Sequence, residues 1–128
     1  MTSDDRERAS PDAKRVLVVE DELLIRMLME DMLQELGYTV AAEAARINDA
    51  LQAATTATFD IAVLDVNLNG ESTGPVADAL AARGMPFIFV TGYGTHGLPP
   101  AHRDRPTLKK PFQMDGLKRT IMTALDAK

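Results

Sequence analysis

The chain has 128 residues, of which 45% are hydrophobic and 26% are charged, a composition typical of one soluble globular domain. Its net charge of −5, from 19 acidic and 14 basic residues, disfavours a nucleic-acid partner. Cysteine is absent, which excludes disulfides and thiolate metal sites. We see neither a membrane-spanning apolar run nor the apolar core of a signal peptide, so we expect a cytoplasmic protein without membrane contacts.

The N-terminal residues 1–14 are polar and of mixed charge, with Pro11 near their end, which predicts a flexible tail. No internal repeat or change in composition marks a second domain. We therefore expect a single folded domain over residues 15–128.

Five short apolar runs are predicted to form strands. Three of them, "VLVV", "IAVL" and "FIFV", are apolar without interruption, the pattern of strands that are buried on both faces of a parallel sheet. In chain order the runs are "RVLVVED" (15–21), "YTVAAEA" (38–44), "FDIAVLD" (59–65), "MPFIFVT" (85–91) and, least marked, "PTLKK" (106–110).

Helical patterns alternate with these strands. The first, over 22–37, ends at Gly37, and its predicted buried stripe is Leu24, Leu28, Met32 and Leu36 with Ile25, Met29 and Leu33 beside it. The others are 48–57 with Asn48 as its cap, 72–84 with Ser72 or Thr73 near its cap, and 114–127. Alternation of strands and helices predicts a doubly wound α/β fold, a parallel sheet with helices on both faces.

After the predicted fourth strand, "GYGTHGLPP" (92–100) is rich in helix breakers where the alternation requires a helix. We therefore expect a weak or missing fourth helix, with a mobile loop over 92–106 and at most a short helical turn around 100–104. The two histidines of this segment, His96 and His102, are expected to be solvated loop residues rather than zinc ligands.

Polar residues end the apolar runs: Glu20 and Asp21, then Asp65, then Thr91, then Lys110. Each has a simple structural explanation, because Asp21 could cap a helix, Asp65 could open a turn, Thr91 could bond the backbone and Lys110 could be solvated. Since the carboxyl ends of parallel strands meet at one edge of a sheet, these residues together predict a ligand site.

Three carboxylates at one edge would repel one another and raise one another's pKa unless a cation lay among them. Oxygen ligands in a chain without cysteine suit a hard ion, which favours Mg²⁺ as the cofactor.

The motifs "VLVVEDE", "IAVLDVNL", "FVTG" and "KKPF", in this order and spacing, resemble the receiver domain of two-component response regulators over residues 15–126. The resemblance implies a flavodoxin-like fold with a five-stranded parallel sheet. It also implies that Asp65 accepts a phosphoryl group, that Glu20 and Asp21 hold Mg²⁺ with Asp65, and that the backbone carbonyl of Asn67 is a further ligand. Thr91 matches the switch hydroxyl and Lys110 the invariant lysine, and the Lys110–Pro111 bond is expected to be cis.

By the same resemblance, the chain is expected to be a signalling protein rather than an enzyme. It would receive a phosphoryl group from a sensor histidine kinase or a histidine phosphotransfer protein, and act through protein contacts or as a phosphate sink. "PFIFVTGYG" (86–94) resembles the FAT GUY subgroup, whose members are typically single-domain regulators, some tied to general stress signalling. A monomer or weak dimer is expected.

Several positions depart from the family pattern or modify it. Many receivers have proline where this chain has Asn69, and an aromatic switch residue where it has Thr107. Gly92 is expected to leave room for the phosphoryl group, and Tyr93 to shield the acyl phosphate or report its presence. Phosphorylation is expected to order the loop over 92–106.

Two other functions use related folds. A haloacid-dehalogenase-like phosphatase would place a general acid two residues after its aspartyl nucleophile, where this chain has Asn67. A nucleotide-binding flavodoxin-like module would have a glycine-rich loop after the first strand, where "EDELL" would repel phosphate unless a metal ion lay between them.

Overall fold

The computed structural model describes residues 13–92 and 97–127. Within them no helix is long and apolar enough to cross a membrane. The elements in chain order are β1 (Arg15–Val19), α2 (Leu23–Glu35), β2 (Thr39–Ala44), α3 (Ile47–Thr56), β3 (Ile61–Asp65), β4 (Asn67–Leu68), β5 (Glu71–Ser72), α4 (Gly74–Ala82), β6 (Phe87–Thr91), the 3-10 helix η2 (Pro100–His102), β7 (Thr107–Lys109) and α5 (Met114–Asp126).

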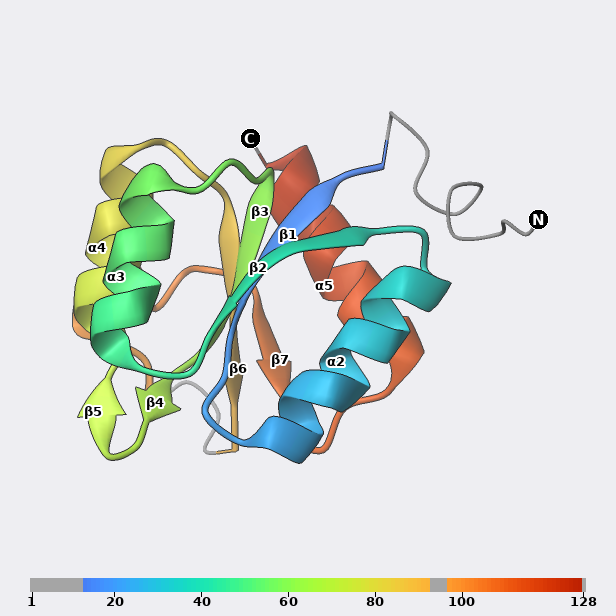
Figure 1. Ribbon diagram of the computed structural model, residues 1–128, viewed down its shortest axis with the longest axis horizontal. Coiled ribbons are helices and arrows are strands. Elements are labelled where there is room, and N and C mark those ends of the chain that lie inside the picture. Colours follow the sequence, from blue (N-terminus) through green and yellow to red (C-terminus); the bar gives the residue numbers. More distant parts are fainter. Residues whose placement is uncertain (1–12, 93–96, 128) are drawn as a thin grey trace.

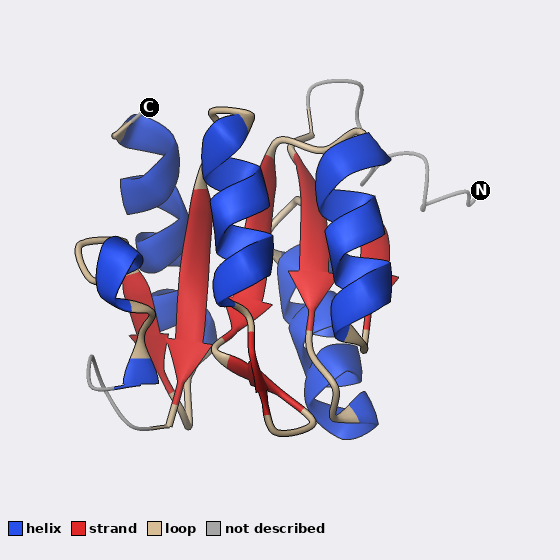
Figure 2. Cartoon of the chain, turned by 90° about the vertical axis from the view of Figure 1, so that its left-hand side faces the viewer, coloured by secondary structure: helices blue, strands red, loops and turns tan. Residues whose placement is uncertain are grey.

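The main sheet has five strands in the order β2-β1-β3-β6-β7, and every neighbouring pair is parallel. Figure 2 shows its arrows pointing the same way, with the short β4–β5 hairpin at their carboxyl ends. The strand order reverses between β1 and β3, the place where ligands bind in open α/β sheets. The predicted doubly wound fold and its five strands are confirmed.

Helices cover both faces of the sheet, α3 and α4 on one side and α2 and α5 on the other (Figure 1). Two clusters of buried residues fill the layers, because successive strand residues point to opposite faces. Leu17, Leu64 and Phe89 belong to the cluster beneath α3 and α4, and Val18, Val63 and Ile88 to the cluster beneath α2 and α5. Both faces of the central strands are therefore apolar, as their uninterrupted runs predict.

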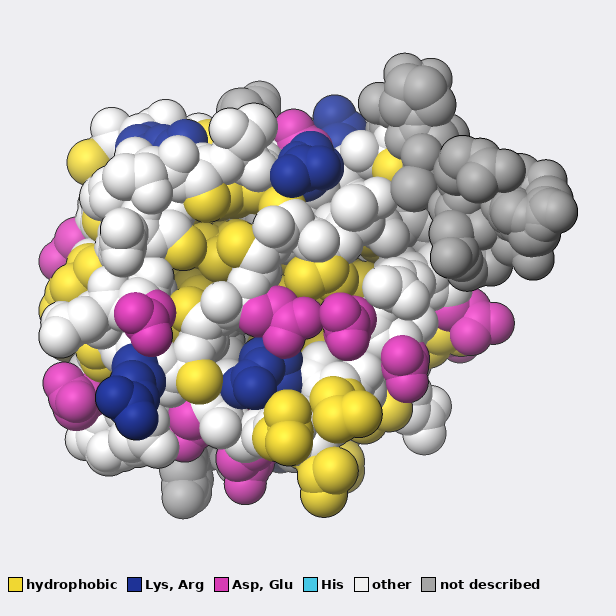
Figure 3. Space-filling model, viewed as in Figure 1, with side chains coloured by type: hydrophobic (Ala, Val, Ile, Leu, Met, Phe, Trp, Pro, Cys, Tyr) yellow, Lys and Arg dark blue, Asp and Glu magenta, His cyan; other side chains and the backbone are white. Residues whose placement is uncertain are grey.

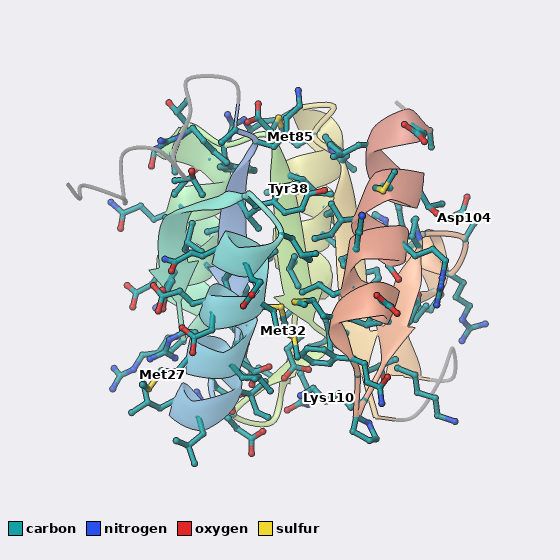
Figure 4. All side chains as sticks on the ribbon, turned by 90° about the vertical axis from the view of Figure 1, so that its right-hand side faces the viewer. Met27, Met32, Tyr38, Met85, Asp104 and Lys110 are labelled. Atoms are coloured by element: carbon teal, nitrogen blue, oxygen red, sulfur yellow. The ribbon has the colours of Figure 1, made fainter. Side chains whose placement is uncertain are left out.

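The buried face of α2 differs from the predicted stripe. Met29 and Leu33 are buried, with Met32 and Leu36 packed against the same cluster, whereas the side chains of Leu24 and Leu28 are exposed. Residues 23–29 are apolar on every side of the helix except at Arg26, so periodicity there could not select a face. Figure 4 shows Met32 pointing from α2 toward α5, and Met27 pointing outward.

Of the two predicted helix caps, the one at Asn48 is wrong and the one at Ser72 or Thr73 is confirmed. Helix α3 begins at Ile47, so Asn48 already lies in its first turn and does not cap it. The predicted start of α4 is confirmed, because Thr73 is its N-cap residue and Oγ of Ser72 accepts the N–H of Gly74, the first residue of the helix, at 3.0 Å. The side chain of Thr73 itself makes no cap hydrogen bond. Its hydroxyl turns into the protein instead, toward the end of β3.

The segment after β6 contains the predicted short helical turn, η2, and no α-helix among its described residues 97–106. His102 is not solvated as predicted but buried, because its ring lies 5.5 Å from that of Phe87 and its Nε2 atom lies 2.8 Å from Oδ1 of Asp78 on α4. Leu98 is also buried. His96 lies outside the described residues, and the mobility of the segment stays a prediction.

Because Leu24 is 79% exposed and Leu33 is 0% exposed on the same helix, replacing each by alanine tests the observed face of α2. We expect Leu33→Ala to lower the free energy of unfolding by about 2–5 kcal/mol. Leu24→Ala, the matched control, should change it by less than about 0.5 kcal/mol. Urea unfolding followed by circular dichroism measures both, and equal losses would contradict this packing.

Candidate functional site

The carboxyl ends of the central strands bring together the polar residues that the sequence singled out. Asp65 is the last residue of β3, and Thr91 is the last residue of β6. A pocket at this edge is lined by Asp21, Glu22, Asp65, Val66, Asn67, Thr91, Gly92, Gly97 and Lys110. The predicted convergence of residues far apart in the sequence is therefore found.

Glu20, Asp21 and Asp65 form a compact acidic group, with one carboxylate oxygen of each within 4.8 Å of the others. Glu20 is buried, and burial raises the pKa of its carboxyl to about 7; the negative charge of Asp65 adds to this rise. The backbone N–H of Glu22, which donates to Oε2 of Glu20 at 3.0 Å, and the charge of Lys110 offset only part of it.

Lys110 supplies the positive charge opposite these acids. Its Nζ atom donates to Oδ2 of Asp65 at 3.1 Å and lies 3.4 Å from Oε1 of Glu20. Burial acts to lower the pKa of the Lys110 ammonium, but the hydrogen bond and the two negative charges outweigh burial and leave the pKa raised. Figure 4 shows Lys110 at the edge of the sheet near the start of α2.

The acidic group has the donor chemistry of a site for a hard divalent cation. With all three carboxylates ionised, the single ammonium of Lys110 leaves an excess of negative charge. Oε1 of Glu20 is buried and accepts no hydrogen bond from the described residues. All three side chains offer oxygen, the ligand that Mg²⁺ prefers. The residues thus fit a magnesium ion.

The other predicted site residues occupy several positions around the pocket. Asn67 is exposed at its rim, and its N–H donates to Oδ1 of Asp65 at 3.3 Å; its carbonyl as a metal ligand stays a prediction. Thr91 is buried, and its carbonyl accepts the N–H of Lys110 at 2.8 Å. A Cβ atom added to Gly92 would meet no atom within 4 Å, so a larger side chain there could enter the pocket.

Of three further predicted positions, Thr107 and Pro111 do not line the pocket, and Tyr93 is not among the described residues. Thr107 begins β7 beside Phe89, and its hydroxyl donates to the carbonyl of Arg105 at 3.0 Å. The Lys110–Pro111 peptide bond is cis.

Two residues that hold the site were not identified from the sequence. Thr73 is fully buried, and its hydroxyl lies 2.8 Å from the carbonyl of Asp65 and 3.1 Å from that of Val66. Arg26 donates from Nη1 to the carbonyl of Glu20 at 2.9 Å and from Nε to Glu43 at 3.0 Å. Arg26 is the single charged residue within "LLIRMLM" (23–29), which was the sequence feature that could have indicated a structural role for it.

Comparisons with known proteins agree with this geometry. A profile of the response regulator receiver domain matches residues 16–122. The chain is 43% identical to SdrG of Sphingomonas melonis Fr1, with a TM-score of 0.79 over 88% of this chain and 97% of that one. It is 31% identical over 116 residues, 88% of this chain, to the transcriptional regulatory protein PdtaR of Mycobacterium tuberculosis. It is 27% identical to the anti-anti-sigma factor PhyR of Bartonella quintana, with a TM-score of 0.75 over 94% of this chain and 51% of that one.

The chain spans about half the length of the curated relatives it matches, for example 57% of PdtaR. These relatives are receiver domains and response regulators, which are signalling proteins rather than classical enzymes. The family profile covers most of the chain, and its match includes Asp65, Thr91 and Lys110 together with the acids that follow β1. The chain therefore belongs to the receiver domain family of two-component response regulators.

Proposed function

We propose that this receiver accepts a phosphoryl group on Asp65 in a magnesium-dependent reaction, from a sensor histidine kinase or a histidine phosphotransfer protein. The proposal is supported by one observation: the ammonium of Lys110 donates a hydrogen bond to Asp65 at 3.1 Å, beside an acidic group suited to a divalent cation. Its output is a protein contact that changes with phosphorylation, or the removal of phosphoryl groups from a shared kinase.

The chemistry requires little from the protein besides position and charge. A carboxylate oxygen of Asp65 attacks phosphorus while the phosphorus–nitrogen bond of the donor breaks, and the imidazole nitrogen keeps the electron pair of that bond. The transition state is loose, with charge spread over the phosphoryl oxygens, so neutralisation of that charge dominates. Lys110 pairs with one oxygen and the hydroxyl of Thr91 donates to another. When bound among Glu20, Asp21 and Asp65, Mg²⁺ supplies further positive charge.

The phosphatase alternative has no support from the site. Asn67 stands where a haloacid-dehalogenase-like enzyme would carry its general acid, and an amide has no titratable proton to donate to a leaving group. A nucleotide-binding function is likewise disfavoured, since β1 is followed by Glu20, Asp21 and Glu22 and not by a glycine-rich loop whose N–H groups would hold a phosphate chain.

An exposed apolar patch lies beside the pocket and suits the phosphodonor protein. We define the α2 patch as Leu23, Leu24, Met27 and Leu28, which are between 44% and 79% exposed. Figure 3 shows hydrophobic side chains gathered over the first turns of α2. Glu22, which directly precedes this helix, lines the pocket, so a protein that brings a phosphohistidine to Asp65 must cover the adjoining surface. Burial of the patch would stabilise that encounter.

Phosphoryl transfer itself is tested by intact mass. After incubation with Mg²⁺ and phosphoramidate, we expect one phosphoryl adduct on the wild type and none on Asp65→Asn. Asp104→Asn, which removes an exposed carboxylate elsewhere, is the matched control and should be labelled like the wild type. Labelling of Asp65→Asn, or steady hydrolysis of phosphate esters by the wild type, would contradict the proposal.

The metal is tested by stability. Mg²⁺ that binds only the folded state raises the free energy of unfolding, by about 2.7 kcal/mol at a concentration of 100 times Kd. We expect this rise in thermal unfolding of the wild type and its loss in Asp21→Asn. Glu71→Gln, an exposed acid of the β4–β5 hairpin, should keep it. An absent rise in the wild type, or an equal rise in Asp21→Asn, would argue against a magnesium site here.

The α2 patch is tested by comparing two phosphodonors. The donor is the phosphorylated histidine kinase that, in a screen of several kinases, transfers its phosphoryl group to the wild type fastest. We expect Leu24→Gln combined with Met27→Gln to slow this transfer by about tenfold or more, because apolar burial at the contact is lost. Labelling by phosphoramidate should not change, because that donor is too small to contact the patch. Met122→Gln, another exposed apolar residue but on α5, is the control. Undiminished transfer to the double variant would exclude the patch as the kinase contact.

A further inference from the structure

The hairpin after Asp65 has a turn that only a few residues can form. Strands β4 and β5 pair Asn67 with Ser72, and the turn between them is Asn69-Gly70. Both turn residues have positive φ, 52° at Asn69 and 88° at Gly70, as a type I′ turn requires. The side chain of Asn67 accepts the N–H of Gly70 at 2.8 Å. The backbone at the tip of this hairpin is therefore closely specified.

This tip reaches back to two other loops at the same edge. The backbone N–H of Asn69 donates to Oδ2 of Asp21 at 3.1 Å, across 48 positions in the sequence. Its side-chain amide donates to the carbonyl of Ala45, between β2 and α3, at 3.3 Å. Asn69 thus joins the hairpin to the carboxylate of Asp21 through its backbone, and to a second loop through its side chain.

The backbone bond matters because of what Asp21 would otherwise do. Asp21 is only partly buried, and its carboxylate lies close to those of Glu20 and Asp65. The side chain of Glu20 is buried, and that of Asp65 accepts a hydrogen bond from Lys110. Repulsion from those two acids would favour a rotamer of Asp21 that points to solvent. A hydrogen bond from an N–H to an ionised carboxylate is among the stronger ones in proteins and opposes that rotation.

We propose that Asn69 is a positioning residue for the metal site, whose backbone N–H holds the carboxylate of Asp21 within the acidic group before the cation arrives. This inference rests on the proposed function, since it takes Asp21 to be a magnesium ligand. The essential features of position 69 are a backbone N–H and access to positive φ. The side-chain amide contributes only the second contact, to Ala45.

Two substitutions separate these features. Asn69→Pro removes the N–H and fixes φ near −65°, so it abolishes both the donor and the turn. Asn69→Gly keeps the N–H and adopts positive φ readily, while losing the contact to Ala45. We expect calorimetric titration with Mg²⁺ to give a Kd raised about tenfold in Asn69→Pro, the loss of one charge-assisted hydrogen bond. In Asn69→Gly the Kd should stay within about twofold of the wild type.

A second measurement examines the contact in the metal-free protein, whether or not Asn69→Pro folds well. In ¹H–¹⁵N spectra recorded with a chelator, Asp21→Asn should shift the amide proton of Asn69 upfield, because its charged acceptor is gone. Glu22→Gln, a neutralisation of the next residue, should leave that proton in place.

The outcomes distinguish this inference from the function on which it rests. Equal Kd values in the wild type, Asn69→Gly and Asn69→Pro, or an unmoved Asn69 amide in Asp21→Asn, would overturn the positioning role while leaving phosphoryl acceptance intact. A raised Kd in Asn69→Gly equal to that in Asn69→Pro would overturn it too, in favour of the side-chain amide. A wild type that neither binds Mg²⁺ nor forms the phosphoramidate adduct would overturn both proposals.

Discussion

Repulsion among the carboxylates of Glu20, Asp21 and Asp65 is the constraint on which the rest of the site depends. One oxygen of each lies within 4.8 Å of the others, and among the described residues the cation paired with them is Lys110, at 3.1 Å from Asp65. This repulsion affects Glu20, because burial and the neighbouring charge of Asp65 disfavour its ionised form and raise the pKa of its carboxyl to about 7. An arrangement that the protein must hold against its own charge is suited to binding a cation and then a group rich in negative oxygens.

The parallel sheet makes this arrangement possible. Its central strands are apolar on both faces and pack firmly in the core, and the acids follow or end these strands at one edge of the sheet. Strands β1 and β3 are neighbours at the point where the strand order reverses, so the acids that follow or end them meet without a dedicated loop. Side chains from the helices that follow these strands, and from their caps, then contact the backbone carbonyls of the acids. Thr73 contacts the carbonyl of Asp65, and Arg26 donates to the carbonyl of Glu20. The core therefore determines where the site lies, and these bonds determine how its acids are held.

Sequence reasoning succeeded where one local pattern determined the outcome. Uninterrupted apolar runs such as "IAVL" predicted central strands, and the polar residues at their ends predicted which side chains converge. It failed at α2, where apolar residues surround the first turns and hide the face that packs inward. The buried state of His102 and the bond from Asn69 to Asp21 were also missed, because each joins segments more than 20 residues apart. The Asn-Gly pair in "NLNGES" (67–72) was the available hairpin signal.

The most direct test of the account is a crystal structure of the protein with Mg²⁺ and beryllium trifluoride, a mimic of the phosphoryl group. The account predicts the mimic on the carboxylate of Asp65 with the ammonium of Lys110 against one of its fluorines, and the metal ion held by the acids that follow β1 and end β3. A mimic bound to another side chain, or a Lys110 ammonium turned into bulk solvent with the metal ion elsewhere, would contradict it.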